Sequence, residues 1–277
     1  MSDMTREPGA PDTIVLIHGL WMTSLSWENW VQRYTGRGYT VIARDWPRMD
    51  ADIEALRRDP SALAGLGVRE IVDHYDGIVR ALDAPPIIMG HSFGGLFTQM
   101  LLDRGLGAAG VAIDSAPIKG VLTLPFSTLK VSFPALSNPA NLNKVGALTP
   151  EQFHYAFTNN LSEAESREVY DRYAVPGPDH VLFQAGLANV TPHAATCVNV
   201  RNDDRAPLLL IAGGKDHIVP PSITESTFKL YRKSKAVTEL KEFPERSHYT
   251  LGEPGWEDVA DFALDWAVKN ARVPAAV

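Results

Sequence analysis

Short apolar runs alternate along the chain with segments in which apolar residues recur at helical spacing. Six of these runs are predicted strands, at residues 13–17, 39–43, 85–89, 110–114, 207–213 and 236–243. Strands that are apolar at almost every position are covered on both faces, and helices between them point to parallel pairing. The pattern therefore predicts an α/β fold with a mostly parallel central sheet of about six strands flanked by helices.

The predicted helices are recognised by their apolar stripes. The clearest stripe comprises Val68, Ile71, Val72, Tyr75, Ile78, Val79 and Leu82. Further helices are expected near residues 27–34, 53–56, 96–101, 224–232 and 259–266. Each of them lies between two of the predicted strands or after the last one, as a parallel sheet requires.

The alternation of strands and helices is lost between residues 117 and 205. This block is rich in Pro, Phe and Leu, and capping-box sequences at 149–152 and 162–165 predict two helices within it. It is too apolar to remain a disordered linker. We therefore expect a core formed by residues 1–116 and 206–277, with residues 117–205 inserted as a helical cap.

Composition narrows the class of protein without identifying it. The chain has 277 residues, 45% of them hydrophobic, and a formal net charge of −7. An acidic chain argues against nucleic acid or an anionic membrane as the main partner, and no apolar stretch approaches the length of a membrane span. A single cysteine and the lack of a secretory signal pattern favour the cytoplasm. Nothing in the sequence specifies an oligomeric state.

The run Gly-His-Ser-Phe-Gly-Gly at residues 90–95 carries the strongest chemical signal. It lies between the third predicted strand and a helical pattern. A serine on such a sharp strand-to-helix turn is held strained and exposed, and glycines permit the close backbone approach. At roughly 7% abundance for Gly and Ser, the bare motif arises by chance in about one in ten chains of this length. Its context predicts that Ser92 is a nucleophile rather than an ordinary helix cap.

A nucleophilic serine needs a base, and the base needs a third group to orient it. Asp216 follows the fifth predicted strand, and His248 follows the sixth. Because the carboxyl ends of parallel strands meet at one edge of a sheet, Ser92, Asp216 and His248 are expected to form a catalytic triad there. The backbone N–H groups of Leu20 and Phe93 are the candidate donors of an oxyanion hole.

Two of these assignments have competitors. Asp114 also follows a predicted strand and is the alternative acid, unless it only caps a turn. Among the other histidines, His18 and His91 lie inside motifs where structural hydrogen bonds are expected, and the side chain of His217 should diverge from its neighbour Asp216. Candidate walls of a substrate pocket, for which core packing is the other interpretation, are Trp21, Met22, Trp46 and Tyr249.

Four segments together resemble the α/β-hydrolase fold family, in particular its small bacterial serine esterase and cofactor-free haloperoxidase-like branch. They are residues 14–19, 90–95 and 213–220 and the pair Ser247-His248. The resemblance implies cleavage of a carboxylic ester through an acyl-enzyme, with no metal and no organic cofactor. The sequence departs from the family pattern in two places. The antiparallel hairpin at the start of the sheet is missing, and residues 45–49 replace a glycine-rich turn.

The sequence thus predicts a serine hydrolase that acts on an uncharged, fairly apolar carboxylic ester of small-molecule size. The same site could open a lactone, cleave a thioester or form peracids. A ligand-binding module on a hydrolase scaffold and an interaction protein with an inactive site are the alternatives outside the enzymes. Because the cap carries no motif, the natural substrate is not specified.

Overall fold

The central sheet contains six parallel strands in the order β2-β1-β3-β4-β7-β8. This order is seen in a computed structural model that describes residues 10–50 and 52–272. The strands are β1 (Thr13–Ile17), β2 (Thr40–Ala43), β3 (Ile87–His91), β4 (Ala109–Ile113), β7 (Leu208–Gly213) and β8 (Thr238–Phe243). Each coincides with a predicted strand to within two residues. Within the described residues every pairing in this sheet is parallel, which confirms the predicted α/β class.

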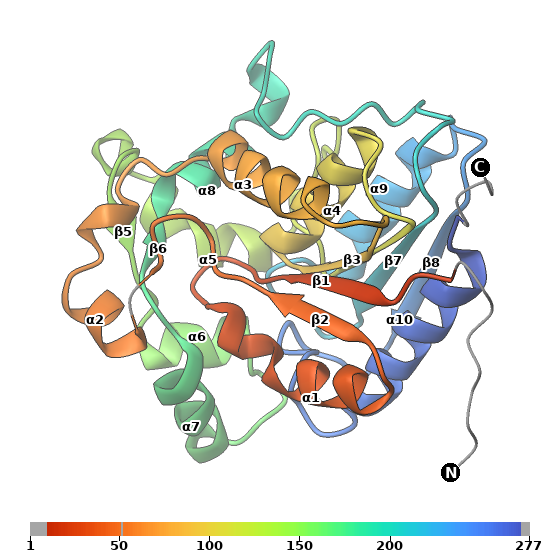
Figure 1. Ribbon diagram of the computed structural model, residues 1–277. Coiled ribbons are helices and arrows are strands. Elements are labelled where there is room, and N and C mark those ends of the chain that lie inside the picture. Colours follow the sequence, from red (N-terminus) through yellow and green to blue (C-terminus); the bar gives the residue numbers. More distant parts are fainter. Residues whose placement is uncertain (1–9, 51, 273–277) are drawn as a thin grey trace.

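Helices cover both faces of the sheet (Figure 1). On one face lie α1 (Glu28–Gly36) and α10 (Trp256–Asn270), and on the other lie α3 (Val68–Arg80), α4 (Phe93–Asp103) and α9 (Pro221–Tyr231). Strand β1 shows how one sequence serves both faces, because Ile14 and Leu16 pack with the first group of helices and Val15 and Ile17 with the second. All four side chains are fully buried.

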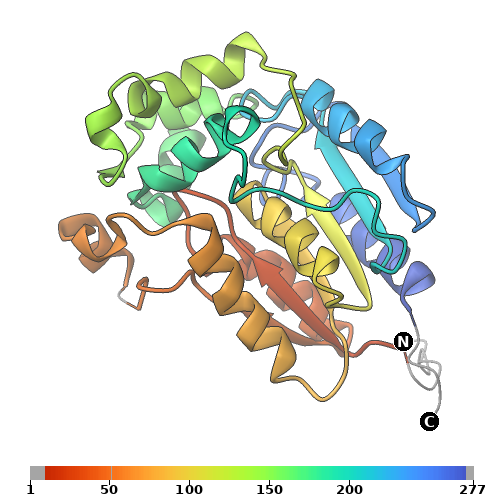
Figure 2. The ribbon, with the colours of Figure 1, turned by 90° about the horizontal axis from the view of Figure 1, so that it is seen from above.

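The chain between β4 and β7 forms a separate cluster of short elements. Its helices are α5 (Phe126–Leu136), α6 (Pro150–Ala156), α7 (Glu163–Tyr173) and α8 (Asp179–Gly186), with short 3-10 turns at Pro139–Asn141 and Ala188–Val190. A two-stranded antiparallel ribbon joins β5 (Val145–Gly146) to β6 (Gly177–Pro178). These elements lie at the end of the sheet to which the strand arrows point, and Figure 2 shows them gathered on one side of the molecule.

Both predicted capping boxes are present in this cluster. The Thr149 and Ser162 side chains accept hydrogen bonds from the backbone N–H groups of Gln152 and Glu165, whose side chains return a bond to the cap residue. Each cap of this kind stabilises a helix by roughly 1 kcal/mol. The capping boxes thus define the first turns of α6 and α7, two short helices that would have only marginal stability on their own.

Contacts with the first half of the chain hold the cluster in place. Arg57, on α2 (Ile53–Arg58), donates to the carbonyl oxygens of Tyr170, Asp171 and Ala174 at the end of α7. Two further 3-10 turns, Ser24–Trp27 and Ser61–Leu63, complete the described elements. None of the helices in the described ranges is long and apolar enough to span a bilayer.

Candidate active site

Ser92 occupies a strained turn between β3 and α4. Its backbone angles are φ 56° and ψ −120°, a region that residues with a side chain seldom adopt. Glycine is required on both sides, since a Cβ on Gly90 would lie 2.0 Å from the carbonyl oxygen of Gly94, and one on Gly94 would lie 2.0 Å from that of Ile17. Hydrogen bonds from Ser92 N to Ile113 O and from Ala116 N to Ser92 O fix the turn against β4. The predicted sharp strand-to-helix turn at Ser92, which we call the elbow, is therefore present in the backbone.

The loop after β1 passes directly over Ser92. A Cβ on Gly19 would lie 2.8 Å from the Cβ of Ser92 and 3.4 Å from its Oγ, so that the next residue, Leu20, is beside the elbow. His18 anchors this loop: its Nε2 accepts a hydrogen bond from Trp46 N at 3.2 Å, and its Nδ1–H donates to Gly19 O at 2.8 Å. Burial lowers the pKa of His18, in agreement with a neutral ring in these bonds.

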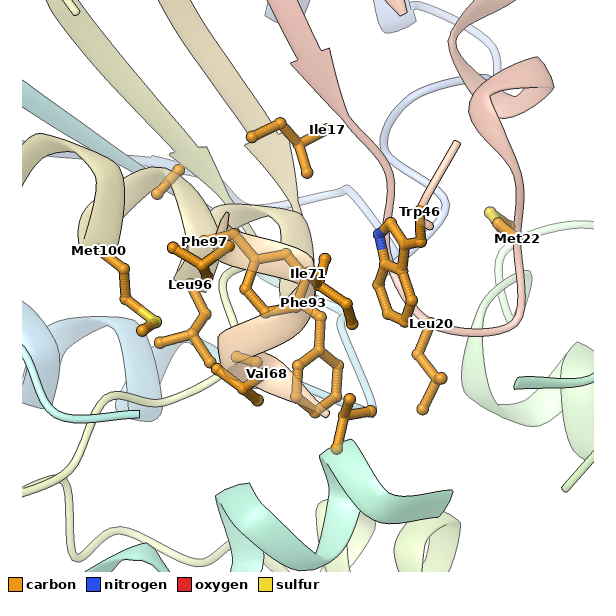
Figure 3. Close-up of a cluster of buried hydrophobic side chains, with 14 of the residues drawn as sticks. Ile17, Leu20, Met22, Trp46, Val68, Ile71, Phe93, Leu96, Phe97 and Met100 are labelled. Atoms are coloured by element: carbon orange, nitrogen blue, oxygen red, sulfur yellow. The ribbon is translucent and has the colours of Figure 1, made fainter. Parts of the chain in front are cut away.

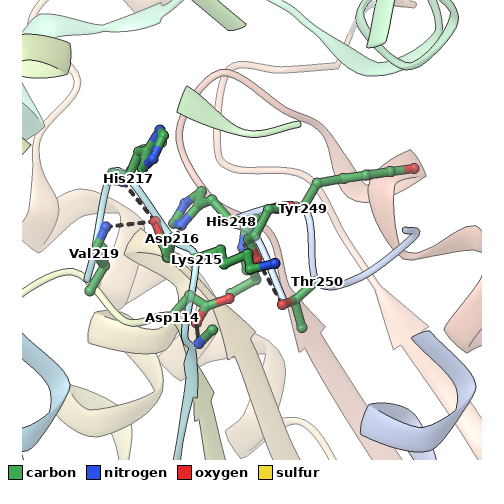
Figure 4. Close-up of polar contacts among 12 residues, drawn as sticks. Asp114, Lys215, Asp216, His217, Val219, His248, Tyr249 and Thr250 are labelled. Carbon is green, nitrogen blue, oxygen red and sulfur yellow. Dashed lines mark hydrogen bonds and ion pairs between the residues drawn. The ribbon is translucent and has the colours of Figure 1, made fainter. Parts of the chain in front are cut away.

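A buried hydrogen bond joins the predicted base to the predicted acid (Figure 4). His248 Nδ1 lies 2.6 Å from Asp216 Oδ2, and both side chains are fully inaccessible to solvent. The other carboxylate oxygen of Asp216 accepts hydrogen bonds from the backbone N–H groups of Ile218 and Val219. Among the described residues, His248 Nε2 has no hydrogen-bond partner. This is the nitrogen that a general base would use.

His248 also lies next to the elbow. The ring of His91, which precedes Ser92, is 4.6 Å from the His248 ring, and its Nε2–H donates to the His248 carbonyl oxygen at 2.8 Å. Burial, and then the proximity of His248, keeps the pKa of His91 well below its usual value. The prediction that His91 makes a structural hydrogen bond near the site agrees with this contact.

Glu253 holds the loop that carries His248, and it was not predicted from the sequence. Its carboxylate accepts hydrogen bonds from both the backbone N–H and the hydroxyl of Ser247, at 2.8 and 2.9 Å. The Glu253 side chain is buried. A glutamate six residues after Ser247 forms no recognisable sequence motif. Its hydrogen bonds to Ser247 depend on the turn that brings the chain back to this residue.

Asp114 lies in the same buried region without occupying the position of Asp216. One of its oxygens accepts a 2.6 Å hydrogen bond from Gly213 N, and the other has no partner within the described part of the chain. Burial, and then the neighbouring Asp216 charge, raises the pKa of Asp114 well above its usual value. The two carboxyl groups thus differ in their partners, since Asp114 accepts from Gly213 N and Asp216 lies against His248 Nδ1.

Donor atoms of His91, Asp114 and His248 come within 4.8 Å of one another, and all three residues are buried. Three such donors could contact one metal ion. Each of the three residues is also hydrogen-bonded within the protein, His91 to His248 O, His248 to Asp216 and Asp114 to Gly213 N. We therefore interpret the cluster as part of the polar network around His248.

The four predicted pocket residues are all buried near these loops. Trp21 lines two pockets of about 250 and 320 Å³ whose other walls come mainly from the inserted cluster, and its ring packs at a steep angle against Phe157. Trp46 stacks on His18 at 5.1 Å and belongs, with Met22, to the apolar cluster that also contains Leu20 and Phe93 (Figure 3). Tyr249 lies 6.1 Å from Tyr173 of α7.

The site is closed in this structure. Ser92 is 5% exposed and His248 is not exposed at all. Phe157, from the loop between α6 and α7, stands edge-on to the His248 ring at 4.9 Å. This contact was not predicted, because the sequence of the inserted block contains no motif that points to it.

The fold and this arrangement of side chains place the chain in a known family. Residues 14–262 match the alpha/beta hydrolase family, and the chain belongs to it. No curated protein matches the sequence.

Solved structures share the fold at low sequence identity. The monoacylglycerol lipase of Paleococcus ferrophilus is 22% identical with a TM-score of 0.63, covering 95% of this chain and 97% of its own. An extracellular alpha/beta-hydrolase from a Paenibacillus species is 20% identical with a TM-score of 0.65, covering 95% and 100%. Tomato methylketone synthase I, complexed with 2-tridecanone, is 15% identical with a TM-score of 0.66, covering 94% and 99%. Likeness at this level shows the common fold, and the chemistry has to be argued from the site.

Proposed function

We propose that the protein is a serine hydrolase that cleaves an uncharged, fairly apolar carboxylic ester through an acyl-enzyme. The observation that carries the proposal is the buried 2.6 Å hydrogen bond between His248 and Asp216 beside the strained turn of Ser92. A solved structure of the same fold is named a monoacylglycerol lipase, and that name also denotes an ester-cleaving enzyme.

In the proposed mechanism the Ser92 hydroxyl attacks the ester carbonyl and His248 Nε2 accepts its proton. Asp216 fixes the tautomer of His248 and stabilises the imidazolium that forms. The imidazolium then gives its proton to the leaving alcohol. Water, activated in turn by His248, attacks the acyl-enzyme and releases the acid. Neither a metal nor an organic cofactor takes part in these steps.

The developing negative charge needs donors that are already in position. We assign this role to the backbone N–H groups of Leu20 and Phe93, because the loop after β1 lies against Ser92 and Phe93 is the first residue of α4. Removing one donor of an oxyanion hole typically lowers kcat by about 100-fold to 1,000-fold.

The inserted block from residue 117 to 205 would act as the cap that covers the site and selects the substrate. Trp21, Met22, Trp46 and Tyr249 are the proposed pocket walls, and their aromatic and apolar side chains favour an uncharged acyl or alcohol group. Because Ser92 and His248 are covered, substrate entry requires the cap to move.

The decisive variant is Ser92→Ala. We expect a loss on the order of 10⁴-fold or more in kcat on p-nitrophenyl esters, together with loss of labelling by an active-site-directed fluorophosphonate. A lactone and thioester panel run beside esters of rising acyl length would identify the preferred bond. Near-native turnover by pure Ser92→Ala would exclude the mechanism, and an unlabelled wild-type Ser92 would favour a ligand-binding module.

A further inference from the structure

The loop between α6 and α7 contacts both of the loops that carry the proposed acid and base. On the acid side, Asn159 Nδ2 donates to the carbonyl oxygen of Lys215 at 3.0 Å, directly before Asp216. His217 Nδ1–H donates to Tyr155 O at 2.8 Å, with the two rings 4.6 Å apart. The residues on both sides of Asp216 are therefore tied to the cap.

The same loop is tied to the segment around His248. The backbone N–H of Tyr249 donates to Phe157 O at 2.9 Å. Asn160 Nδ2 donates to Glu245 O at 2.7 Å and to the carboxylate of Glu253 at 3.2 Å. Since Glu253 in turn holds Ser247, this hydrogen-bond path leads from the cap to the residue before His248.

The loop itself is well fixed. Phe157 and Thr158 are buried, and the hydroxyl groups of Thr158 and Ser166 lie 2.6 Å apart, which joins the loop to α7. Capping boxes define the starts of α6 and α7. By contrast, Asn159 is half-buried and Asn160 is exposed, so neither side chain fills the core.

We infer that residues 157–160 of the cap position Asp216 and His248 relative to each other, with Asn159 and Asn160 as the positioning residues. This inference rests on the proposed function. Asp216 and His248 follow different strands, β7 and β8, and their hydrogen bond needs both loops in place. The cap adds polar contacts to each loop from outside the sheet. Its role then goes beyond covering the substrate, because an altered cap also changes the acid–base pair.

The test is the double variant Asn159→Ala/Asn160→Ala. We expect kcat on an ester substrate to fall on the order of 10-fold to 100-fold, because small displacements of catalytic groups have effects of this size. KM should change little, since within the described part of the chain the two side chains are hydrogen-bonded to Lys215, Glu245 and Glu253 and not to a proposed pocket wall. The low-field proton resonance of the His248 Nδ1–H, assigned by its loss in His248→Ala, should broaden or shift.

The matched control is Asn189→Ala. Asn189 is also an exposed cap asparagine with two hydrogen bonds to backbone, accepting from Gly120 N and donating to Val121 O, both within the cap. We expect this variant to keep wild-type kcat and the wild-type resonance, with melting temperatures recorded for both. Equal kcat and an unchanged resonance in the double variant would overturn the inference. The resonance needs no turnover, so the positioning role can be judged even if wild-type Ser92 fails to react.

Discussion

At the scale of single residues, the elbow depends on glycines, because these residues have no Cβ. Gly94 lies where α4 crosses the end of β1, and the carbonyl oxygen of Ile17 occupies the space that a side chain would need. The close crossing is what brings the loop after β1 onto Ser92. The glycines of the motif are thus required by packing between elements as much as by the turn itself.

We expect Gly94→Ala to lower the free energy of unfolding by roughly 4 kcal/mol or more, or to prevent folding, because the new Cβ would lie 2.0 Å from a backbone oxygen that cannot move. Gly77→Ala is the control. Gly77 lies inside α3 with no atom within 4 Å of its would-be Cβ, so alanine should stabilise the protein by roughly 0.5–1 kcal/mol. Urea unfolding of the two variants tests the contrast. Equal effects would show that the predicted clash is relieved.

At the scale of elements, the carboxyl end of α7 accepts hydrogen bonds from a side chain on another helix. The last carbonyl groups of a helix have no partner within it. Here the guanidinium of Arg57 donates to the carbonyl oxygens of Tyr170, Asp171 and Ala174 at the end of α7, which joins α2 to the cap. It also pairs with Glu54 on its own helix.

Replacing this arginine should loosen the cap. We expect Arg57→Gln to lower the free energy of unfolding by about 1–3 kcal/mol, the range for hydrogen bonds from a charged group. The exposed neighbour Arg58 gives the control, since Arg58→Gln should stay within about 0.5 kcal/mol of wild type. Thermal unfolding and hydrogen exchange of the α7 amides measure both effects. Unchanged exchange in Arg57→Gln would contradict the assignment.

The elements that could be predicted are those with a regular pattern of burial. Strands β1, β3, β4 and β7 are evident as nearly continuous apolar runs that are buried, and the stripe of α3 is evident because its buried positions recur at helical spacing. The cap lacks this regularity: α5 has no buried residue and contains Pro134, and β5 and β6 are two residues each. Its helices were found only where capping boxes marked them.

The candidate site was predictable in outline for a related reason. Parallel strands bring their carboxyl ends together, so residues at those ends could be grouped without coordinates. Asp114 and Asp216 both satisfy that rule, and only the structure shows that Asp216 bonds to His248. Glu253 holds Ser247 through a turn of the chain, and Asn160 reaches Glu253 from a distant loop, so no local sequence pattern encodes either hydrogen bond.

At the scale of the whole molecule, buried titratable groups make stability depend on pH. Burial keeps the pKa values of His18 and His91 below the usual 6.5, so the unfolded chain binds protons that the folded protein does not. The free energy of unfolding should therefore fall as pH decreases below about 6.5. Asp114 acts in the opposite direction: its pKa is raised above 3.8, and its contribution to stability is lost as pH rises through the raised value.

The variant Asp114→Asn separates the two contributions. Its stability should increase more between pH 5 and pH 7 than that of wild type, by up to about 1.4 kcal/mol per pH unit in the range where Asp114 titrates. Because the asparagine can still accept from Gly213 N, kcat should be retained within a few-fold. Urea unfolding at several pH values, with ester turnover at pH 7, measures both. Parallel stability curves would contradict the raised pKa, and loss of turnover would instead assign Asp114 as the acid.

The insertion of the cap between β4 and β7 also has a consequence for biosynthesis. Gly110 pairs with Leu208 across the whole inserted block, so the sheet cannot be completed locally. A chain leaving the ribosome contains β1, β3, β4 and the Ser92 turn long before Asp216 and His248 have been translated. Long-range pairing of this kind is slow to form. The nascent protein thus carries its proposed nucleophile without acid or base, and the proposed catalytic centre can be assembled only after Asp216 and His248 have been translated and β8 has joined the sheet.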